Sequence, residues 1–301
     1  MLGMACGDAL GAQVEFRPRG TFRTPRDMTG GGPHSLKAGQ WTDDTAMALA
    51  LADHLTADVR TRREERADLM ARWCNWVEFG VYSCTGTCFD IGARTAAALK
   101  SWIDRGQVLS PTASRPYAEG NGAVMRVAPV ALRWLRDEEM CASAAHGQAM
   151  LTHGRIAAGA AVVVAEAARR LLLGAEPTSA GLMRWLFDEH SPTLAASYVR
   201  QTGARDPRDL SPDEVESGGH SLDTTEAALW CLLRSDSPEQ AIVMAVGLGY
   251  DSDTTAAVTG ALAGAAWGAA ALPSRWTERV AWREQLEKTA DRLLEAAETR
   301  N

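Results

Sequence analysis

The sequence predicts an all-α protein, and three observations lead to this class. Residues that favour helices (Ala, Leu, Met, Arg and Glu) dominate the chain, runs of alternating β-branched residues are scarce, and apolar residues recur at the helical period. The only strand-like run, residues 161–164, lies inside residues 153–173, whose apolar positions keep a period of 3.6 residues. No linker composition and no internal repeat divides the chain. We therefore expect residues 1–301 to form one compact, orthogonal helical bundle.

In the first half of the chain, the helix over residues 2–14 carries Gly7 and Gly11, which clear one face for close packing. The helix over 43–57 is apolar on nearly all sides and is expected to be buried. The charged run at 60–66 mixes arginine with glutamate, so it indicates a solvated helix start rather than a basic patch. The further helices of this half are expected at 63–79, 91–103, 123–135, 138–151 and 153–173.

In the second half, a helix is expected over residues 253–272, and its stretch 254–272 is uncharged and about as long as a short membrane span. It consists mostly of alanine and glycine, which favour transfer into lipid far less than leucine or phenylalanine do, and no basic flank orients it. Gly260, Gly264 and Gly268 recur at every fourth position, so we expect a central buried helix with one face free of side chains. The remaining helices are expected at 179–187, 223–233, 238–246 and 279–299.

Three long irregular stretches separate these helices, at residues 16–41, 104–122 and 202–221. Loops of this length are uncommon unless they serve a function. We therefore expect them to shape a binding site.

Charge and cysteine content narrow the class of protein further. The 31 Lys and Arg residues against 38 Asp and Glu residues give a net charge of −7, which argues against a broad surface for nucleic-acid phosphates. The six scattered cysteines fit a reducing cytoplasm, and Cys84 and Cys88 lack a second pair of ligands at zinc-finger spacing. The N-terminal segment has no basic region and contains Asp8, so we expect neither a signal peptide nor a membrane segment.

Two helix starts carry paired carboxylates. Thr42, Asp43 and Asp44 stand at the start of the buried helix over 43–57. Asp251, Asp253 and Thr254 stand at the start of the small-residue helix over 253–272. Each group could simply cap its helix and complement the helix dipole. Two carboxylates at the start of a buried helix are costly, however, unless a positive charge compensates them, and hard oxygen donors suit Mg²⁺ or Mn²⁺. Both interpretations remain open for each cluster taken alone.

Three further features could contribute to a site. Asp8 lies in a third acidic junction, at residues 7–11, and Glu15 lies at the end of the same helix. The segment Gly120–Asn121–Gly122 opens a helix with free N–H groups, where a phosphate or a ribose oxygen could bind. His153 is either a structural histidine or a ligand contact. Patterns for P-loop, dinucleotide-binding, zinc-protease and serine-hydrolase sites are absent from the sequence.

Taken in order, six motifs of this chain resemble the ADP-ribosylglycohydrolase family, which includes the dinitrogenase-reductase-activating glycohydrolases. The resemblance runs from residue 3 to about residue 276, and it implies an all-α bundle with a dinuclear Mg²⁺ or Mn²⁺ centre at helix N-termini. The motifs are GDALGAQVEF at 7–16, GQWTDDTAMALALAD at 39–53, TGTCFDIG at 85–92, GNGAVMRVAPVAL at 120–132, LTHG at 151–154 and GYDSDTTAAVTGALAGAAWG at 249–268.

The resemblance also implies roles for individual residues. The implied metal ligands are Thr42, Asp43, Asp44, Asp251, Asp253 and Thr254. The implied catalytic residues are Asp44, Glu15 and Asp90. The implied contacts to ADP-ribose are Gly120, Asn121, Gly122, Ala123, Met125 and His153.

Two positions depart from the family pattern. Relatives often have asparagine where this chain has Ala93, so one polar contact near the glycosidic bond is missing or replaced. Glu119 lies beside the loop implied to face the phosphates, where an acid is unfavourable unless it points to a ribose or to solvent.

The implied activity is removal of ADP-ribose from a modified acceptor, most often the guanidinium of arginine, by cleavage of the C1–N bond with two Mg²⁺ or Mn²⁺ ions. The implied substrates are an ADP-ribosylated protein or a small ADP-ribosyl conjugate, and ADP-ribose is the product. Nucleic acid is expected only as a modified substrate. The alternative is a non-catalytic protein on the same scaffold that binds ADP-ribose or a nucleotide, or is purely structural. The sequence leaves the acceptor open among arginine, serine, an acetyl ester and a nucleobase.

Overall fold

The computed structural model describes residues 1–58, 61–108, 119–188, 190, 191 and 193–299. Within these residues the regular structure is helical, and β-pairing is confined to the isolated bridges Gly31–Leu36 and Gly120–His220. The predicted all-α class is confirmed. The helices are α1 (Leu2–Gly11), α2 (Asp43–Leu55), α3 (Arg62–Phe79), α4 (Ala93–Arg105), η1 (Asn121–Ala123), α5 (Ala128–Arg133), α6 (Glu138–Ala149), α7 (Arg155–Leu172), η2 (Ser179–Met183), α8 (Arg184–Phe187), α9 (Leu194–Thr202), α10 (Ser221–Leu233), α11 (Pro238–Gly247), α12 (Ser252–Trp267), η3 (Ala269–Ala271), α13 (Ser274–Thr277) and α14 (Arg283–Glu298).

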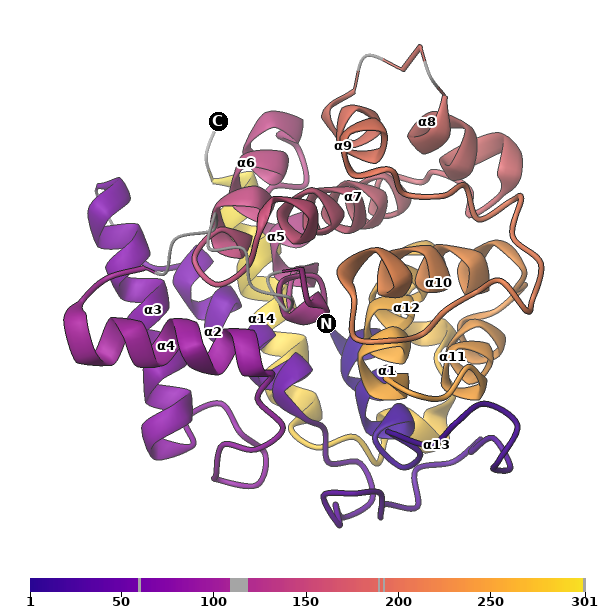
Figure 1. The fold of residues 1–301 in the computed structure, drawn as a ribbon, viewed down its shortest axis with the longest axis horizontal. Coiled ribbons are helices and arrows are strands. Elements are labelled where there is room, and N and C mark those ends of the chain that lie inside the picture. The colour runs from indigo at the N-terminus through magenta and orange to yellow at the C-terminus, as the bar shows by residue number, and fades with distance from the viewer. Residues whose placement is uncertain (59–60, 109–118, 189, 192, 300–301) are drawn as a thin grey trace.

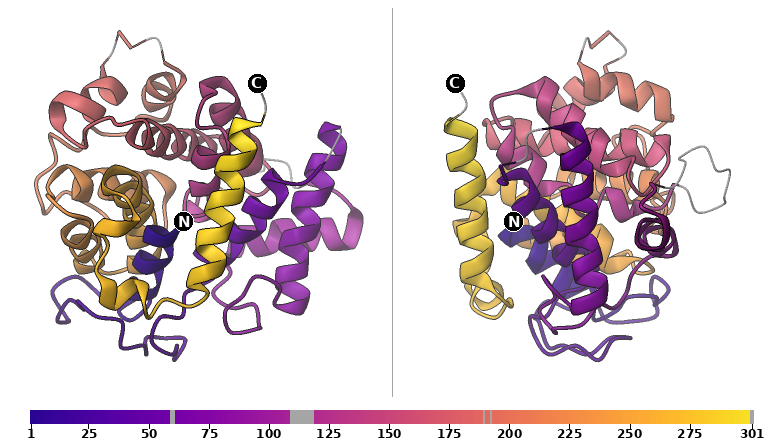
Figure 2. Two further views of the ribbon diagram at one scale, coloured as in Figure 1. Left: turned by 180° about the vertical axis from the view of Figure 1, so that it is seen from behind. Right: turned by 90° about the vertical axis from the view of Figure 1, so that its left-hand side faces the viewer.

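Helix α12 lies at the centre of the helix arrangement. It packs against α1, α7, α10 and α11, while α2, α3 and α4 lie together on the other side of the molecule (Figure 1). Helix α14 packs against α2 and α5 and lies on the outer side of one face, as the two views of Figure 2 show. Helix α2 nevertheless contacts α12, so the two helix starts that carry the paired carboxylates belong to helices that touch.

Helices α1 and α12 cross with their backbones in contact. A Cβ atom added at Gly7 would lie 2.0 Å from the carbonyl oxygen of Ala256, and one added at Gly3 would lie 2.3 Å from that of Gly260. Only glycine allows this approach. The predicted face without side chains is confirmed at Gly260, but Gly268 is not part of it, because its positive φ of 79° ends α12.

Several predicted helix boundaries are wrong, for local reasons. The helix predicted over 123–135 begins only at Ala128, because Pro129 occupies its first turn, and a separate 3-10 turn covers Asn121–Ala123. The helix predicted over 253–272 ends at Trp267. The helix predicted over 2–14 ends at Gly11, and that over 279–299 begins at Arg283, after the left-handed residue Trp282. The helices predicted over 91–103 and 153–173 are shifted by about two residues at their starts.

The prediction missed helix α9. Thr193 caps it by accepting a hydrogen bond from the N–H of Ala196, and Gly203 ends it in a left-handed conformation with φ of 73°. A cap threonine and a terminal glycine around a short apolar repeat were the signals available in the sequence. Helix α3, in contrast, begins as expected, with a capping box between Thr61 and Glu64.

The loops predicted at 16–41 and 202–221 are irregular as expected, and residues 109–118 of the third loop lie outside the described residues. None of the helices in the described part of the chain is both long and apolar enough to cross a membrane.

Candidate functional site

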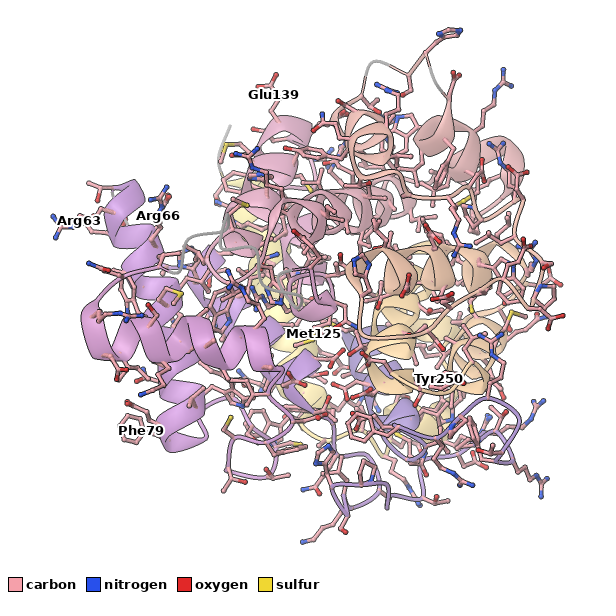
Figure 3. All side chains as sticks on the ribbon, in the orientation of Figure 1. Arg63, Arg66, Phe79, Met125, Glu139 and Tyr250 are labelled. Carbon is pink, nitrogen blue, oxygen red and sulfur yellow. The ribbon has the colours of Figure 1, made fainter. Side chains whose placement is uncertain are left out.

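One pocket of about 510 Å³ collects most of the residues that the sequence analysis singled out. Figure 3 shows Met125, one of its lining residues, near the middle of the molecule, whereas Arg63, Phe79 and Glu139 project from the periphery. The lining residues are Glu15, Phe16, Asp43, Asp90, Ile91, Gly92, Ala93, Arg94, Thr95, Gly120, Asn121, Gly122, Met125, His153, Gly219, Asp251, Asp253 and Thr254.

At the start of α2, the hydroxyl of Thr42 does not cap the helix, so the capping interpretation is wrong for this side chain. Its Oγ1 lies 3.0 Å from Asp8 Oδ1, 3.3 Å from Asp44 Oδ2 and 3.3 Å from Asp253 Oδ2. Asp8, from α1, accepts hydrogen bonds from the N–H groups of Thr42 and Thr45, at 2.9 and 3.1 Å. The start of α2 is therefore capped by Asp8 of α1. The carboxylate of Asp44 remains free to contact the residues at the start of α12.

The start of α12 meets the start of α2. Thr254 Oγ1 donates to Asp44 Oδ2 at 3.3 Å, between residues 210 positions apart in the sequence. Tyr250 is left-handed, with φ of 55°, and the chain turns there, so that Asp251 and Asp253 both reach the pocket although they are two residues apart. Asp251 makes no cap bond either; its Oδ2 accepts from the Asn121 side-chain amide at 2.9 Å.

The carboxylates of this cluster repel one another in a buried setting, although the buried Arg126 interacts electrostatically with Asp43. Burial and the neighbouring acids raise the pKa of Asp43, Asp44 and Asp253 well above the usual value of an aspartate. Asp44 Oδ1 and Asp253 Oδ1 are buried without a hydrogen-bond partner. Unpartnered carboxylate oxygens beside two threonine hydroxyls form an oxygen-only donor set, which is the chemistry that fits Mg²⁺ or Mn²⁺.

Glu15 and Asp90 lie on another part of the same pocket wall. Burial, followed by the charges of Asp90 and Asp251, raises the pKa of Glu15 to about 9. Burial also raises the pKa of Asp90 to about 6, although His34 opposes this shift. Asp90 adopts a left-handed conformation with φ of 60°, a strained geometry that is typical of functional positions in a residue other than glycine.

The segment expected to contact ADP-ribose is divided between the pocket and the core. Gly120, Asn121, Gly122, Met125 and His153 line the pocket. His153 is also structural, since its Nδ1 lies 2.7 Å from the Thr152 hydroxyl and burial holds its pKa well below the usual value. Ala123 lies in the core instead, and only its carbonyl oxygen is used, as an acceptor for the side-chain amide of Gln148.

The two departures from the family pattern have different outcomes. Glu119 does not line the pocket; its Oε2 accepts from the N–H of Ala157 at 2.7 Å and so caps the start of α7. A Cβ atom at Gly154 would lie 2.0 Å from Glu119 Oε1, so a larger residue there would displace this carboxylate. Ala93 does line the pocket, where its methyl group provides no polar contact.

We expect Glu119→Ala to destabilise the protein by about 1 kcal/mol, because the first turn of α7 loses its cap. The measurement is urea unfolding, with Glu139→Ala in the exposed first turn of α6 as the matched control, for which only a few tenths of a kcal/mol are expected. Unchanged stability together with a weakened affinity for ADP-ribose would instead assign Glu119 to the pocket.

The sequence analysis missed an arginine and a histidine of this region. Arg94 is buried, lines the pocket and donates from Nε to the carbonyl oxygen of Thr152 at 2.7 Å. His34 contacts Glu15 and Asp90 at 3.3 and 3.1 Å. Arg94 is separated from the FDIG motif only by Ala93, so its position was a usable signal, whereas His34 stands in a long loop whose path the sequence does not reveal.

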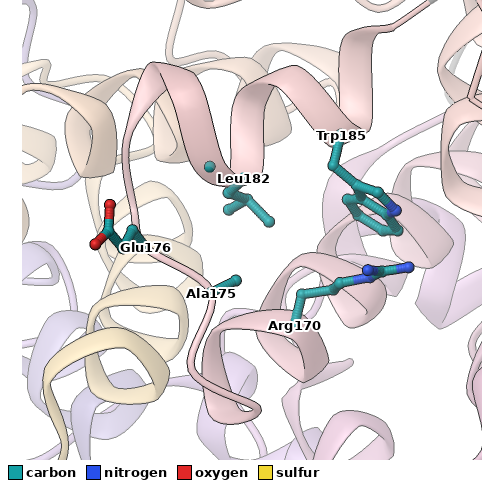
Figure 4. A pocket seen from close by; sticks show the side chains of 6 residues that line it. Arg170, Ala175, Glu176, Leu182 and Trp185 are labelled. Atoms are coloured by element: carbon teal, nitrogen blue, oxygen red, sulfur yellow. The ribbon is translucent and has the colours of Figure 1, made fainter.

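Another pocket, of about 360 Å³, contains none of these carboxylates. In it Arg170 stacks on the indole ring of Trp185 at 4.0 Å, next to Leu182 (Figure 4). We assign it no role in the chemistry.

The fold and the pocket define an all-helical protein whose acidic site is assembled from distant helix starts, and comparison with known proteins gives its family. The model of the ADP-ribosylglycohydrolase family matches residues 1–301. The chain belongs to the ADP-ribosylglycohydrolase family of hydrolases.

Individual relatives agree with this assignment. The chain is 36% identical over 302 residues to "ADP-ribosylarginine hydrolase Tri1" of Pseudomonas putida, covering 99% of this chain and 77% of that protein. It is 30% identical over 307 residues to "ADP-ribosyl-[dinitrogen reductase] glycohydrolase" of Rhodospirillum rubrum, covering 98% and 94% of the two proteins. A solved structure, "ADP-ribosylglycohydrolase-related protein complex", superposes with a TM-score of 0.80 at 36% identity and covers 98% of this chain and 95% of that one.

Proposed function

We propose that this protein is a metal-dependent hydrolase that removes ADP-ribose from modified arginine on a protein or a small conjugate, and that it acts in the cytoplasm. The observation that carries the proposal is the meeting of the α2 and α12 starts, where Thr42, Asp44, Asp253 and Thr254 contact one another through their side-chain oxygens. Two relatives at 32–36% identity are named as ADP-ribosylarginine hydrolases, which supports arginine as the acceptor.

Two Mg²⁺ or Mn²⁺ ions are the proposed cofactors, in keeping with a family that is metal-dependent in general. Their proposed ligands are Thr42, Asp43, Asp44, Asp251, Asp253 and Thr254. When bound, such ions would supply positive charge that holds ribose hydroxyls and lowers the pKa of a nearby water. The unpartnered oxygens of Asp44 and Asp253 support this assignment, because a cation would satisfy them.

The chain's own carboxylates would act as the general acid and the general base. Cleavage of the C1–N bond passes through an oxocarbenium-like state, which needs an acid at the leaving nitrogen and a base for the water. We assign the leaving guanidine to Asp90, because burial raises its pKa to about 6, closer to neutral pH than that of an ordinary aspartate. Asp44 or Glu15 would orient or deprotonate the water. Gly120, Asn121, Gly122, Met125 and His153 would hold the ADP-ribose.

A panel of ADP-ribosyl conjugates tests the proposed acceptor. With Mg²⁺ present, we expect ADP-ribose to be released from the arginine conjugate faster than from the serine, acetyl-ester or nucleobase conjugates, because the carboxyl oxygens of Glu15 and Asp90 on the pocket wall can accept hydrogen bonds from guanidinium N–H groups. The measurement is free ADP-ribose by chromatography. Release that is fastest from a neutral acceptor would contradict the arginine assignment. Calorimetric binding of ADP-ribose with no release from any conjugate would favour the non-catalytic alternative.

A further inference from the structure

A second group of possible metal ligands lies on the pocket wall, apart from the paired carboxylates. His34 Nε2 is 3.3 Å from Glu15 Oε2 and 3.1 Å from Asp90 Oδ1, and one donor atom from each of the three residues lies within 4.8 Å of the others. Unlike the clusters at the starts of α2 and α12, this group includes an imidazole nitrogen.

These short contacts are not good hydrogen bonds. Glu15 Oε2 and His34 Nε2 are both buried, yet neither has a partner in hydrogen-bond geometry. The separations agree with a different arrangement: metal–ligand bonds of about 2.1 Å place neighbouring donors about 3.0 Å apart at right angles and about 3.4 Å apart in a tetrahedron. The His34–Glu15 and His34–Asp90 separations of 3.3 and 3.1 Å therefore match neighbouring ligands of one metal ion, and the Glu15 and Asp90 oxygens lie within 4.8 Å of each other.

The backbone holds the three donors in place from separate segments. His34 stands in a tight turn that is closed by hydrogen bonds between Gly31 and Leu36 in both directions, at 2.8 and 2.9 Å. The turn is pressed against the end of α1, since a Cβ atom at Gly32 would lie 2.0 Å from the carbonyl oxygen of Ala12. Asp90 is held in its left-handed conformation. Such preorganisation reduces the ordering that ligand binding requires.

The local charge is also unfavourable without a cation. Glu15 is 5% exposed and its raised pKa reflects burial together with the charges of Asp90, Asp251 and Asp8. His34 is the basic group that faces both Glu15 and Asp90, and Phe16 and Phe89 flank its ring. A divalent ion would relieve this repulsion, and the aromatic rings would keep water from one side of it.

We propose that Glu15, His34 and Asp90 form a divalent-cation site of their own, apart from the helix starts, for a borderline metal such as Zn²⁺. One imidazole and two carboxylates suit Zn²⁺ better than Mg²⁺, whereas the oxygen-only sets at the helix starts suit Mg²⁺ or Mn²⁺. Binding there takes up both Glu15 and Asp90. If the proposed function holds, Zn²⁺ at this site therefore inhibits hydrolysis, and only this consequence rests on the proposed function.

The test titrates Zn²⁺ into the full chain in saturating Mg²⁺, which keeps the oxygen-only ligands occupied, and measures affinity against a chelator. We expect His34→Ala and His34→Gln to weaken Zn²⁺ binding at least about 10-fold. Glutamine keeps a hydrogen-bond donor for the two carboxylates but offers no imidazole nitrogen, so it separates metal ligation from simple pairing. His54→Ala is the matched control, because His54 pairs with Asp68 at 2.7 Å outside the pocket, and it should bind Zn²⁺ like the wild type.

X-ray absorption at the zinc edge gives a second readout, which should show an imidazole nitrogen in the wild type that is absent in His34→Gln. Circular dichroism checks that each variant folds. If His34→Ala does not fold, His34→Gln alone carries the test. Wild-type Zn²⁺ affinity in a folded His34 variant, or a zinc shell without imidazole, would overturn the proposal. Because binding is measured directly, a protein that hydrolyses no ADP-ribosyl conjugate would refute the proposed function and leave this site standing.

Discussion

Asp44→Asn is expected to lower hydrolysis of ADP-ribosyl-arginine by about 10³-fold or more, because Asp44 is the carboxylate that the α2 and α12 starts share. Loss of a cation ligand removes several kcal/mol of transition-state stabilisation, and each 1.4 kcal/mol corresponds to about a tenfold change in rate. The expected loss is in kcat with Mg²⁺ saturating, measured as release of ADP-ribose.

The same substitution should stabilise the metal-free protein. The pKa of Asp44 is raised in the folded state, so folding of the metal-free chain takes up protons, and its stability falls as pH rises above the unfolded value of about 3.9. Asparagine removes this penalty, and we expect a gain of at least about 1 kcal/mol at neutral pH without metal. Added Mg²⁺ should raise the melting temperature of the wild type and leave that of Asp44→Asn nearly unchanged.

Asp53→Asn is the matched control, since Asp53 lies on the same helix but pairs with Arg292 at the surface, at 2.8 Å. It should retain both activity and stabilisation by Mg²⁺. A variant Asp44→Asn that kept wild-type activity, or that melted at a lower temperature than the wild type without metal, would contradict the role given to this carboxylate.

Gly7→Ala is expected to destabilise the protein by about 3 kcal/mol, at the upper end of the usual range for overpacking. The new methyl group would lie 2.0 Å from the carbonyl oxygen of Ala256 and 2.5 Å from its carbon, and neither backbone atom can move without separating α1 from α12. Separation would also displace Asp8 from the start of α2 and Asp253 from the pocket. Urea unfolding should therefore show reduced stability, and the Mg²⁺ concentration for half-maximal activity should rise.

Gly264→Ala provides the control on the same pair of helices. Its added Cβ atom would meet Gly3 Cα at 3.6 Å, which is an ordinary contact. Alanine in a helix interior is also more stable than glycine by roughly 0.5–1 kcal/mol. We expect unchanged or slightly increased stability. Equal changes in stability for Gly7→Ala and Gly264→Ala would contradict this account. They would show that the close backbone contact at Gly7 is not the reason why α1 and α12 need glycine there.

The sequence was sufficient for features that depend on local composition and on motifs. The helical class followed from periodicity, and the acids at the starts of α2 and α12 were visible as pairs next to small-residue helices. The close crossing could be anticipated from Gly7, Gly11 and Gly260. Most boundary errors arose at single residues, such as Pro129, which delays α5, and Gly268, which ends α12 early.

The sequence could not provide the features that depend on distant contacts. Thr42 looked like a helix cap, but its cap is supplied by Asp8 from α1, a partner 34 positions away. Glu119 looked unfavourable beside a phosphate loop, but it points to the N–H of Ala157 in α7. His34 carried no pattern of its own, because only the folded path of the 16–41 loop brings it to Glu15 and Asp90.

The most direct test of the dinuclear site removes all metal with EDTA, confirms the removal by mass spectrometry, and then titrates Mn²⁺ while ADP-ribose release from ADP-ribosyl-arginine is measured. We predict no release in EDTA and full recovery when two ions are bound per chain, since the acids at the starts of α2 and α12 need both to act. Undiminished release from the metal-free protein would contradict the account.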